Sequence, residues 1–226
     1  NTNAATARVL DKLSITLVEA PKAGCCGAVN YHLSETENGL NAMRANIDAW
    51  WPAIEAGAES IVMTASGCGA MVQEYGHLLA QDAKYSEKAK RVSEMCKDIS
   101  QVLQEEDLSQ IAEQAKDSSS GKVAFHCPCT LQHAMGQSGA VEQVLPELGV
   151  DLGRTKDKHL CCGSAGTYSI LQPELSKKLL NKKVTALSID NPERIVTANI
   201  GCQLHLETAA NVSVDHWIEL VDEIVP

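Results

Sequence analysis

The chain has 226 residues, 44% of them hydrophobic, which is enough for two domains of roughly 110 residues with real cores. Its formal net charge of −10 argues against nucleic-acid binding, because phosphates would be repelled. No apolar run approaches the ~20 residues of a membrane span and no signal peptide is visible, so the nine cysteines favour metal or redox chemistry over structural disulfides.

The first half of the chain alternates β-rich and helical stretches. A strand is predicted at residues 14–21, leading into Cys-Cys-Gly at 25–27. Apolar residues on one stripe predict a helix from Glu35 to Glu55, and the next strand, at 60–66, leads to Cys68. Helices are predicted at about 69–81 and 86–105. The polar linker KDSSSGK follows at 116–122 and is the best candidate for a domain boundary.

The second half has the same alternation. The predicted elements are a strand at 123–129 that ends in cysteine, a helix at 138–148, a strand and loop before Cys161, a helix at 173–188, a strand at 194–200, a short helix after Cys202, and the pair VSV and DHWIELVDEI. Strands alternating with helices predict an α/β fold with mostly parallel sheets, arranged as two three-layer domains. Ligands of such sheets collect at the C-terminal strand ends, where the cysteines fall.

An internal repeat relates the two halves. A shift of 135 or 136 positions pairs VLDKLSI with VLPELGV and superimposes the two Cys-Cys-Gly motifs, and IVMTASGCG then matches IVTANIGCQ. We therefore predict a first module at residues 1–116 and a second at 122–226. By this offset the partner of Cys127 would lie about eight residues before Asn1. The chain is thus interpreted as a piece whose first module lacks its opening strand and first cysteine.

The cysteine spacing predicts metal centres. A 4Fe-4S cluster requires four thiolates, and the cysteines of the second module supply four from three strand ends. The predicted ligands are Cys127, Cys161, Cys162 and Cys202 in the second module, with Cys129 as a fifth candidate, and Cys25, Cys26 and Cys68 in the first. Zinc would accept the same ligands and remains an alternative, and buried free cysteines are the third reading. Gly27, Gly163 and Gly166 allow the sharp turns that bring backbone N–H groups close to sulfur.

Other residues near these motifs favour ordinary roles. His126 and His133 flank Cys127, and we interpret them as hydrogen-bonding neighbours rather than ligands. Cys96 shares a helical spacing with apolar residues and is expected in the core. Four lysines on one predicted helix are expected to form a solvated face: Lys177, Lys178, Lys182 and Lys183.

The doubled motif resembles a known family. AGCCGAVNYHL, TASGCGAMVQEYG, FHCPCTLQHA, HLCCGSAGTYS and VTANIGCQLHL are similar to the cysteine-rich CCG domain of heterodisulfide reductases, anaerobic glycerol-3-phosphate dehydrogenases and lactate-utilisation proteins, and most similar to iron-sulfur subunits of bacterial glycolate oxidases. The heterodisulfide reductase motif ends in Cys-x-x-Cys, where this chain has Met71 and His205. The resemblance therefore makes His205 a candidate substitute ligand or proton carrier.

The resemblance also implies a function. It implies an electron-transfer subunit that takes electrons from flavin-containing partner subunits oxidising glycolate to glyoxylate and passes them towards a quinone pool. Such a chain would be part of an oxidoreductase complex and not catalytic by itself. It would be cytoplasmic, or peripheral on the inner face of the cytoplasmic membrane. The alternative from another class is a zinc-stabilised interaction domain that docks a redox partner without carrying electrons.

Overall fold

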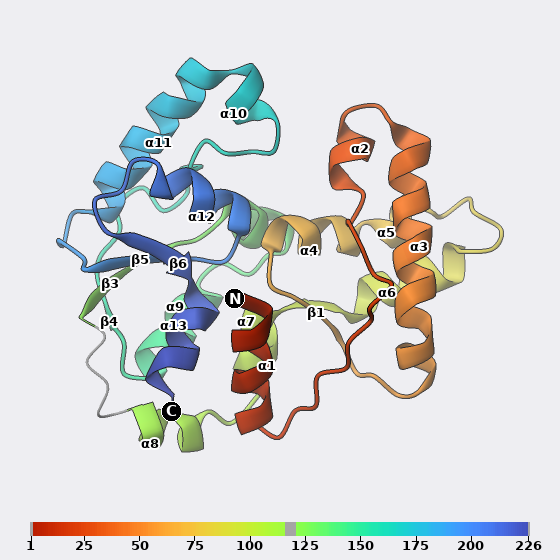
Figure 1. Cartoon of the computed structure of the whole chain (residues 1–226), viewed down its shortest axis with the longest axis horizontal. Helices are drawn as coiled ribbons and strands as arrows, with labels where there is room; N and C mark the ends of the chain where they lie inside the picture. Colours follow the sequence, from red (N-terminus) through yellow and green to blue (C-terminus); the bar gives the residue numbers. More distant parts are fainter. Residues whose placement is uncertain (1, 116–120, 226) are drawn as a thin grey trace. The chain divides into compact units, whose positions relative to one another are not determined.

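The structure, a computed structural model, describes residues 2–115 and 121–225 (Figure 1). The chain packs as two compact units, one formed by Asn1–Thr16 with Ile99–Pro226 and the other by Leu17–Asp98. Most of the predicted linker, residues 116–120, lies outside the described residues. No described helix is both long and apolar enough to cross a bilayer.

A four-stranded parallel sheet forms the centre of the larger unit, in the order β4-β3-β5-β6. Its strands are β3 (Lys122–His126), β4 (Asp151–Leu152), β5 (Arg194–Thr197) and β6 (Ser213–His216). Buried apolar residues dominate the two central strands β3 and β5, as expected for a sheet covered on both faces. The C-terminal strand ends meet at one edge, where His126 is in register with Thr197 and Thr197 with His216.

Helices cover both faces of this sheet. Figure 1 shows α11 and α12 on one face and α9 and α13 on the other. The helical elements are η1 (Thr130–Ala134), α9 (Ala140–Glu147), α10 (Tyr168–Leu171), α11 (Pro173–Leu187), α12 (Ile200–Glu207) and α13 (Trp217–Ile224). The chain runs from β3 outward to β4 in one direction and then to β5 and β6 in the other. Right-handed crossovers in opposite directions place their helices on opposite faces of the sheet. The predicted α/β class with parallel sheets is confirmed.

Three further helices belong to the larger unit: α1 (Thr2–Lys12), α7 (Ile99–Gln104) and α8 (Ser109–Ala115). Helix α1 packs on α13, where the Arg8 guanidinium donates to the Asp222 carboxylate, and α7 packs on α9, where Gln104 donates to Gln143 at 2.6 Å. Parts of the predicted first module thus pack against helices of the second. The compact units are defined by packing and the modules by repetition, so the module boundaries stay a prediction.

The smaller unit contains a two-stranded parallel sheet, β1 (Ile61–Met63) with β2 (Cys96–Asp98). Its helices are α2 (Ala28–His32), α3 (Thr36–Glu55), α4 (Ser66–Gln73), α5 (Tyr75–Leu78) and α6 (Ser86–Met95). Met43 and Ile47 of α3 pack with Val72 and Tyr75 in its core, which confirms the apolar stripe predicted for this helix.

Two predictions in this part of the chain are wrong. Residues 15–20 form no strand, and Val18 is 63% exposed. An extended segment becomes a strand only when a neighbour pairs with its backbone, so β-rich composition was not sufficient. The helix expected at 86–105 is interrupted, because Cys96–Asp98 pairs with β1. Tertiary pairing overrides the helical spacing there, although Cys96 is buried as predicted.

Local geometry repeats where the sequence repeats. Helices α1 and α9 are each followed, two residues after their last residue, by a residue of positive φ: Ser14 (61°) and Gly149 (82°). The following N–H groups, of Ile15 and Val150, donate to the carbonyls of Leu10 and Leu145 at 2.9 and 3.0 Å. This is the left-handed closure common at helix ends. The same backbone device at matching positions supports the duplication.

Candidate metal centre

The second Cys-Cys-Gly motif turns sharply at Gly163, whose φ is 96°. A Cβ at Gly163 would stand 2.5 Å from the carbonyl oxygen of Ser176 in α11, so only glycine fits this approach. The Gly163 N–H donates to Cys161 Sγ at 3.3 Å, and Ser176 Oγ donates to the Gly163 carbonyl at 2.8 Å. The turn is therefore fixed against α11 and directs one backbone N–H at a thiol.

Four thiols form a continuous set at the C-terminal edge of the larger sheet. Cys129 follows β3, Cys161 and Cys162 lie in the loop between β4 and α10, and Cys202 is the third residue of α12. Cys161 lies within hydrogen-bonding reach of both Cys129 and Cys162, and Cys162 within reach of Cys202. Three separate segments thus bring their sulfur atoms to one place.

These contacts change the pKa values of the thiols in opposite directions. The neighbouring Cys129, and then Cys162, lower the pKa of Cys161, whereas contact with Cys161 raises the pKa of both Cys129 and Cys162. The pKa of Cys202 is lowered to about 6, first by Cys162 and further by His126. Two thiols therefore favour the thiolate, the form that binds metals.

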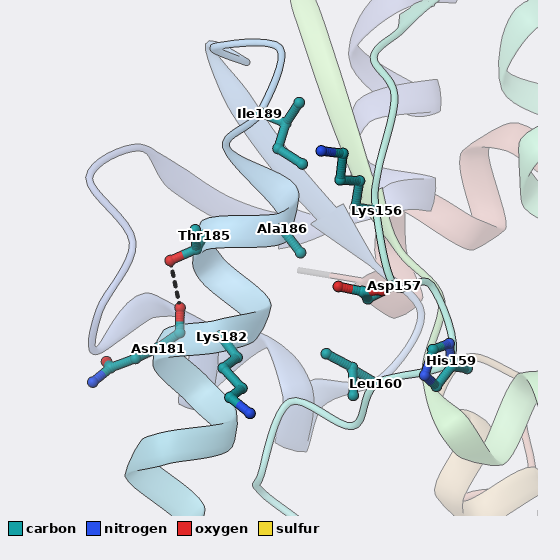
Figure 2. A pocket seen from close by; sticks show the side chains of 9 residues that line it. All are labelled: Lys156, Asp157, His159, Leu160, Asn181, Lys182, Thr185, Ala186 and Ile189. Carbon is teal, nitrogen blue, oxygen red and sulfur yellow. Dashed lines mark hydrogen bonds between the residues drawn. The ribbon is translucent and has the colours of Figure 1, made fainter.

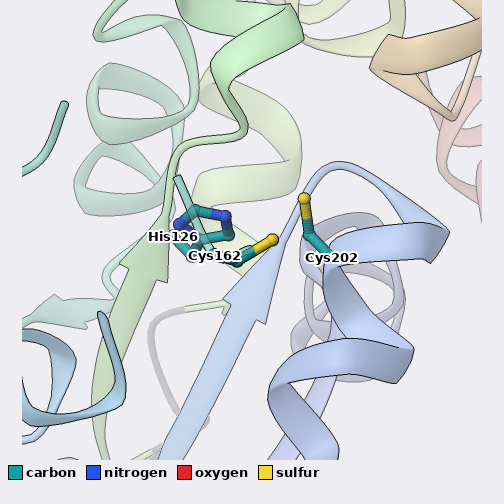
Figure 3. Close-up of side chains that lie close together, drawn as sticks. All are labelled: His126, Cys162 and Cys202. Atoms are coloured by element: carbon teal, nitrogen blue, oxygen red, sulfur yellow. The ribbon is translucent and has the colours of Figure 1, made fainter. Parts of the chain in front are cut away.

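His126 lies beside this set. The ligating atoms of His126, Cys162 and Cys202 all lie within 4.8 Å of one another and all three residues are buried (Figure 3). Neither ring nitrogen of His126 has a nitrogen or oxygen hydrogen-bond partner among the described residues. The sequence predicted a hydrogen-bonding role for His126. In the structure the groups near its ring are the thiols of Cys162 and Cys202. Sulfur donors with one imidazole are typical of zinc and iron sites, so the residues fit a metal centre.

The structure records other contacts for two further candidates, Cys127 and His205. Cys127 is buried, with its Sγ 3.9 Å from the Pro128 carbonyl oxygen. Its role as a ligand stays a prediction, while Cys129, the fifth candidate, is the one in contact with Cys161. His205 Nε2 lies 3.1 Å from Ser176 Oγ. His205 is therefore in hydrogen-bonding contact with Ser176, the residue that fixes the Gly163 turn.

Lys183 is a functional candidate that the sequence misassigned. It is 0% exposed, not part of a solvated face, and its Nζ donates to the carbonyls of Asp157 and Lys158 at 3.2 and 3.1 Å. Burial lowers its pKa, and nearby cysteines, Cys127 first, oppose that shift. Lys183 thus anchors the loop before Cys161 to α11 and places a cationic group near the thiols.

The first module places its cysteines similarly within the smaller unit. Cys68 is the third residue of α4, as Cys202 is of α12, and it lies within hydrogen-bonding reach of Cys26. This contact lowers the pKa of Cys26 to about 6 and raises that of Cys68. Cys25 is exposed. The Tyr75 hydroxyl donates to the Cys26 carbonyl at 2.8 Å and fixes the motif.

Asn46 anchors the loop before its cysteine motif to α3 in the smaller unit, as Lys183 anchors the corresponding loop to α11 in the larger one. Each is the eleventh residue of its helix, α3 or α11. Asn46 accepts from the Gly24 N–H at 2.7 Å and donates to the Cys25 carbonyl at 2.9 Å. Aligning the two helices from their first residues would have revealed this pair of positions in the sequence. One anchor is neutral and the other cationic, so the two cysteine groups lie in different electrostatic surroundings.

A pocket of about 760 Å³ lies between the 156–160 loop and α11 (Figure 2). Lys156 and Lys182 contribute its positive charges and Asp157 its negative charge. No cysteine lines it, so it is separate from the thiols although Leu160 directly precedes Cys161.

Comparison with known proteins agrees with the cysteine geometry. The pattern of the cysteine-rich domain family CCG matches residues 1–73 and 123–207. The chain belongs to the CCG cysteine-rich domain family. Both matched segments contain a Cys-Cys-Gly motif and the helical cysteine that follows it.

Individual proteins are also similar to the chain. It is 57% identical over 99% of its length to the "Glycolate oxidase iron-sulfur subunit" of Escherichia coli K12, of which it covers 54%. It is 35% identical over 91% of its length to a "Probable glycolate oxidase iron-sulfur subunit" of Bacillus subtilis 168, of which it covers 46%. "Lactate utilization protein A" of Anoxybacillus flavithermus is 26% identical, with 91% of this chain and 84% of that protein covered. The chain thus spans about half the length of the two glycolate oxidase relatives.

Proposed function

We propose that the chain carries an iron-sulfur centre and transfers electrons as part of a glycolate oxidase-type complex. The observation that carries the proposal is the continuous set of thiols of Cys129, Cys161, Cys162 and Cys202 at the C-terminal edge of the sheet. Four thiolates suit a 4Fe-4S cluster, which would accept and release one electron at a time. The 57% identity to a protein named as an iron-sulfur subunit supports the same chemistry.

In this proposal the protein's own groups hold and tune the centre. The Gly163 N–H directed at Cys161 and the buried Lys183 both stabilise negative charge on sulfur. The burial of Cys162 and Cys202 limits the access of water. The Cys25, Cys26 and Cys68 group would form a second centre that needs a further ligand.

The proposed electron path follows the resemblance to glycolate oxidase subunits. Flavin-containing partner subunits would oxidise glycolate and reduce this chain, which would pass electrons towards a quinone pool. The chain would then act in the cytoplasm, or at the inner face of the cytoplasmic membrane, and would not be catalytic alone. The glycines at 27, 163 and 166 would serve the centres through their backbone N–H groups.

Zinc is the competing occupant, because His126, Cys162 and Cys202 present the nitrogen and sulfur donors that zinc also accepts. A zinc-stabilised domain would dock a redox partner without carrying electrons. Anaerobic reconstitution with iron and sulfide, followed by metal analysis and visible absorption, separates the two. Our proposal predicts a brown protein that dithionite bleaches. A colourless protein that binds zinc and takes up no iron would refute it.

A further inference from the structure

His126 is held in a fixed position at the edge of the cysteine group. It is the last residue of β3 and is 1% exposed. Its backbone is in register with Thr197 of β5, and the Thr197 hydroxyl donates to the His126 carbonyl at 3.0 Å. The sheet therefore determines where the imidazole lies.

The imidazole has none of the usual partners of a buried histidine. Neither Nδ1 nor Nε2 has a nitrogen or oxygen hydrogen-bond partner among the residues that the structure describes, and the thiol of Cys202 is the group within its reach. Burying an unpaired polar group is unfavourable, and a histidine with a purely structural role normally bonds a carbonyl or carboxylate. The groups that His126 does approach are thiols of Cys162 and Cys202 (Figure 3).

We propose that His126 is a nitrogen ligand of the metal centre, alongside Cys162 and Cys202. This inference rests on the proposed function, because it requires that the thiols hold a metal. Histidine nitrogen and cysteine thiolate ligate the same iron-sulfur cluster in Rieske-type centres, where two histidines replace two cysteines on one of the two irons. Ligation would also satisfy a buried ring nitrogen that otherwise has no nitrogen or oxygen partner.

The ligand changes the electronic character of the centre. In the proposed centre His126 would take the place of one of the four thiolates. A neutral imidazole there removes one negative charge next to the iron, which raises the reduction potential relative to an all-cysteine centre. The His126→Cys variant restores an anionic sulfur donor at nearly the same position. It is therefore expected to retain iron but to be reduced at a lower potential than the wild-type chain.

The direct test is pulsed electron paramagnetic resonance on the whole chain, reconstituted anaerobically with ferrous iron and sulfide and then reduced. The wild-type spectrum is expected to show hyperfine coupling from a directly bound histidine nitrogen. His126→Cys and His126→Asn are expected to lose that coupling. His133→Asn is the matched control, because His133 lies seven residues further along the chain and is exposed, and it should keep the coupling.

The outcomes separate this inference from the proposed function. An iron-loaded wild-type chain without histidine nitrogen coupling overturns the His126 assignment and leaves the iron-sulfur function standing. This result needs no variant to fold. Coupling that persists in His126→Cys but disappears in His205→Asn also overturns it, since His205 would then be the ligand. A chain that takes up no iron and sulfide overturns both proposals together.

Discussion

Gly163→Ala tests how the Cys-Cys-Gly turn is built. The substitution must adopt a φ near 96°, which is unfavourable by about 1–2 kcal/mol for an L-residue. The added Cβ would also stand 2.5 Å from the Ser176 carbonyl oxygen. Moving a helix backbone to relieve this contact costs about 1–3 kcal/mol more. The expected loss in free energy of unfolding is therefore about 2–5 kcal/mol, with reduced iron uptake because the N–H directed at Cys161 Sγ moves as well.

Gly166→Ala is the matched control for this prediction. Gly166 also has positive φ, 60°, but a Cβ there meets nothing within 4 Å, so the expected loss is only the backbone component of about 1–2 kcal/mol. Urea denaturation of both variants, measured without metal, gives the difference. Equal destabilisation by the two substitutions would show that the close approach to α11 is not what fixes the turn.

Three further predictions concern the groups that hold the motifs. Gly27→Ala should destabilise the smaller unit as Gly163→Ala does the larger, because its Cβ would stand 2.6 Å from the Gly39 carbonyl oxygen; unchanged hydrogen exchange in α3 would contradict this. Tyr75→Phe should lower the free energy of unfolding by about 1–3 kcal/mol, since the hydroxyl donates to the Cys26 carbonyl and accepts from Asn46; an unchanged urea midpoint would be inconsistent with that role. Burial lowers the pKa of Lys183, so the unfolded chain binds its proton more strongly. The contribution of Lys183 to stability therefore rises with pH up to the unfolded pKa of about 10.4. Lys183→Met should flatten the increase as the pH approaches that value in metal-free protein, and identical slopes would refute the assignment.

The sequence predicted the architecture of the larger unit because its strands are buried on both faces and its helices are periodic. The strand Lys122–His126 overlaps the predicted strand at 123–129, and Arg194–Thr197 lies within the predicted strand at 194–200. The strand expected at 14–21 failed because pairing partners cannot be read from composition. The Cys96–Asp98 strand was missed because its three residues gain their conformation from pairing with β1 rather than from local propensity.

The site was only partly predictable for a related reason. The duplicated motif identified the cysteines that gather at strand ends, and the contact of Cys161 with Cys162 and Cys129 agrees with a shared centre. The sequence ranked Cys127 above Cys129, whereas the structure brings Cys129 into contact with Cys161. The two cysteines are two residues apart, so sequence alone does not decide which of them faces the loop. Burial of Lys183 and the unpaired imidazole of His126 depend on packing between distant segments. Neither property has a local sequence signal.

Iron and sulfide content per chain after anaerobic reconstitution tests the proposed centre most directly, and Cys161→Ser is the decisive variant. Cys161 contacts both Cys129 and Cys162, so its loss interrupts the set of thiols in the middle. Cys96→Ala serves as the control, because Cys96 is buried in β2 of the other compact unit with its Sγ 3.6 Å from the Gly69 carbonyl oxygen. We expect Cys161→Ser to lose the iron and sulfide of the larger unit while Cys96→Ala keeps the wild-type content. Equal iron and sulfide in wild type and Cys161→Ser would contradict an iron-sulfur centre at this site.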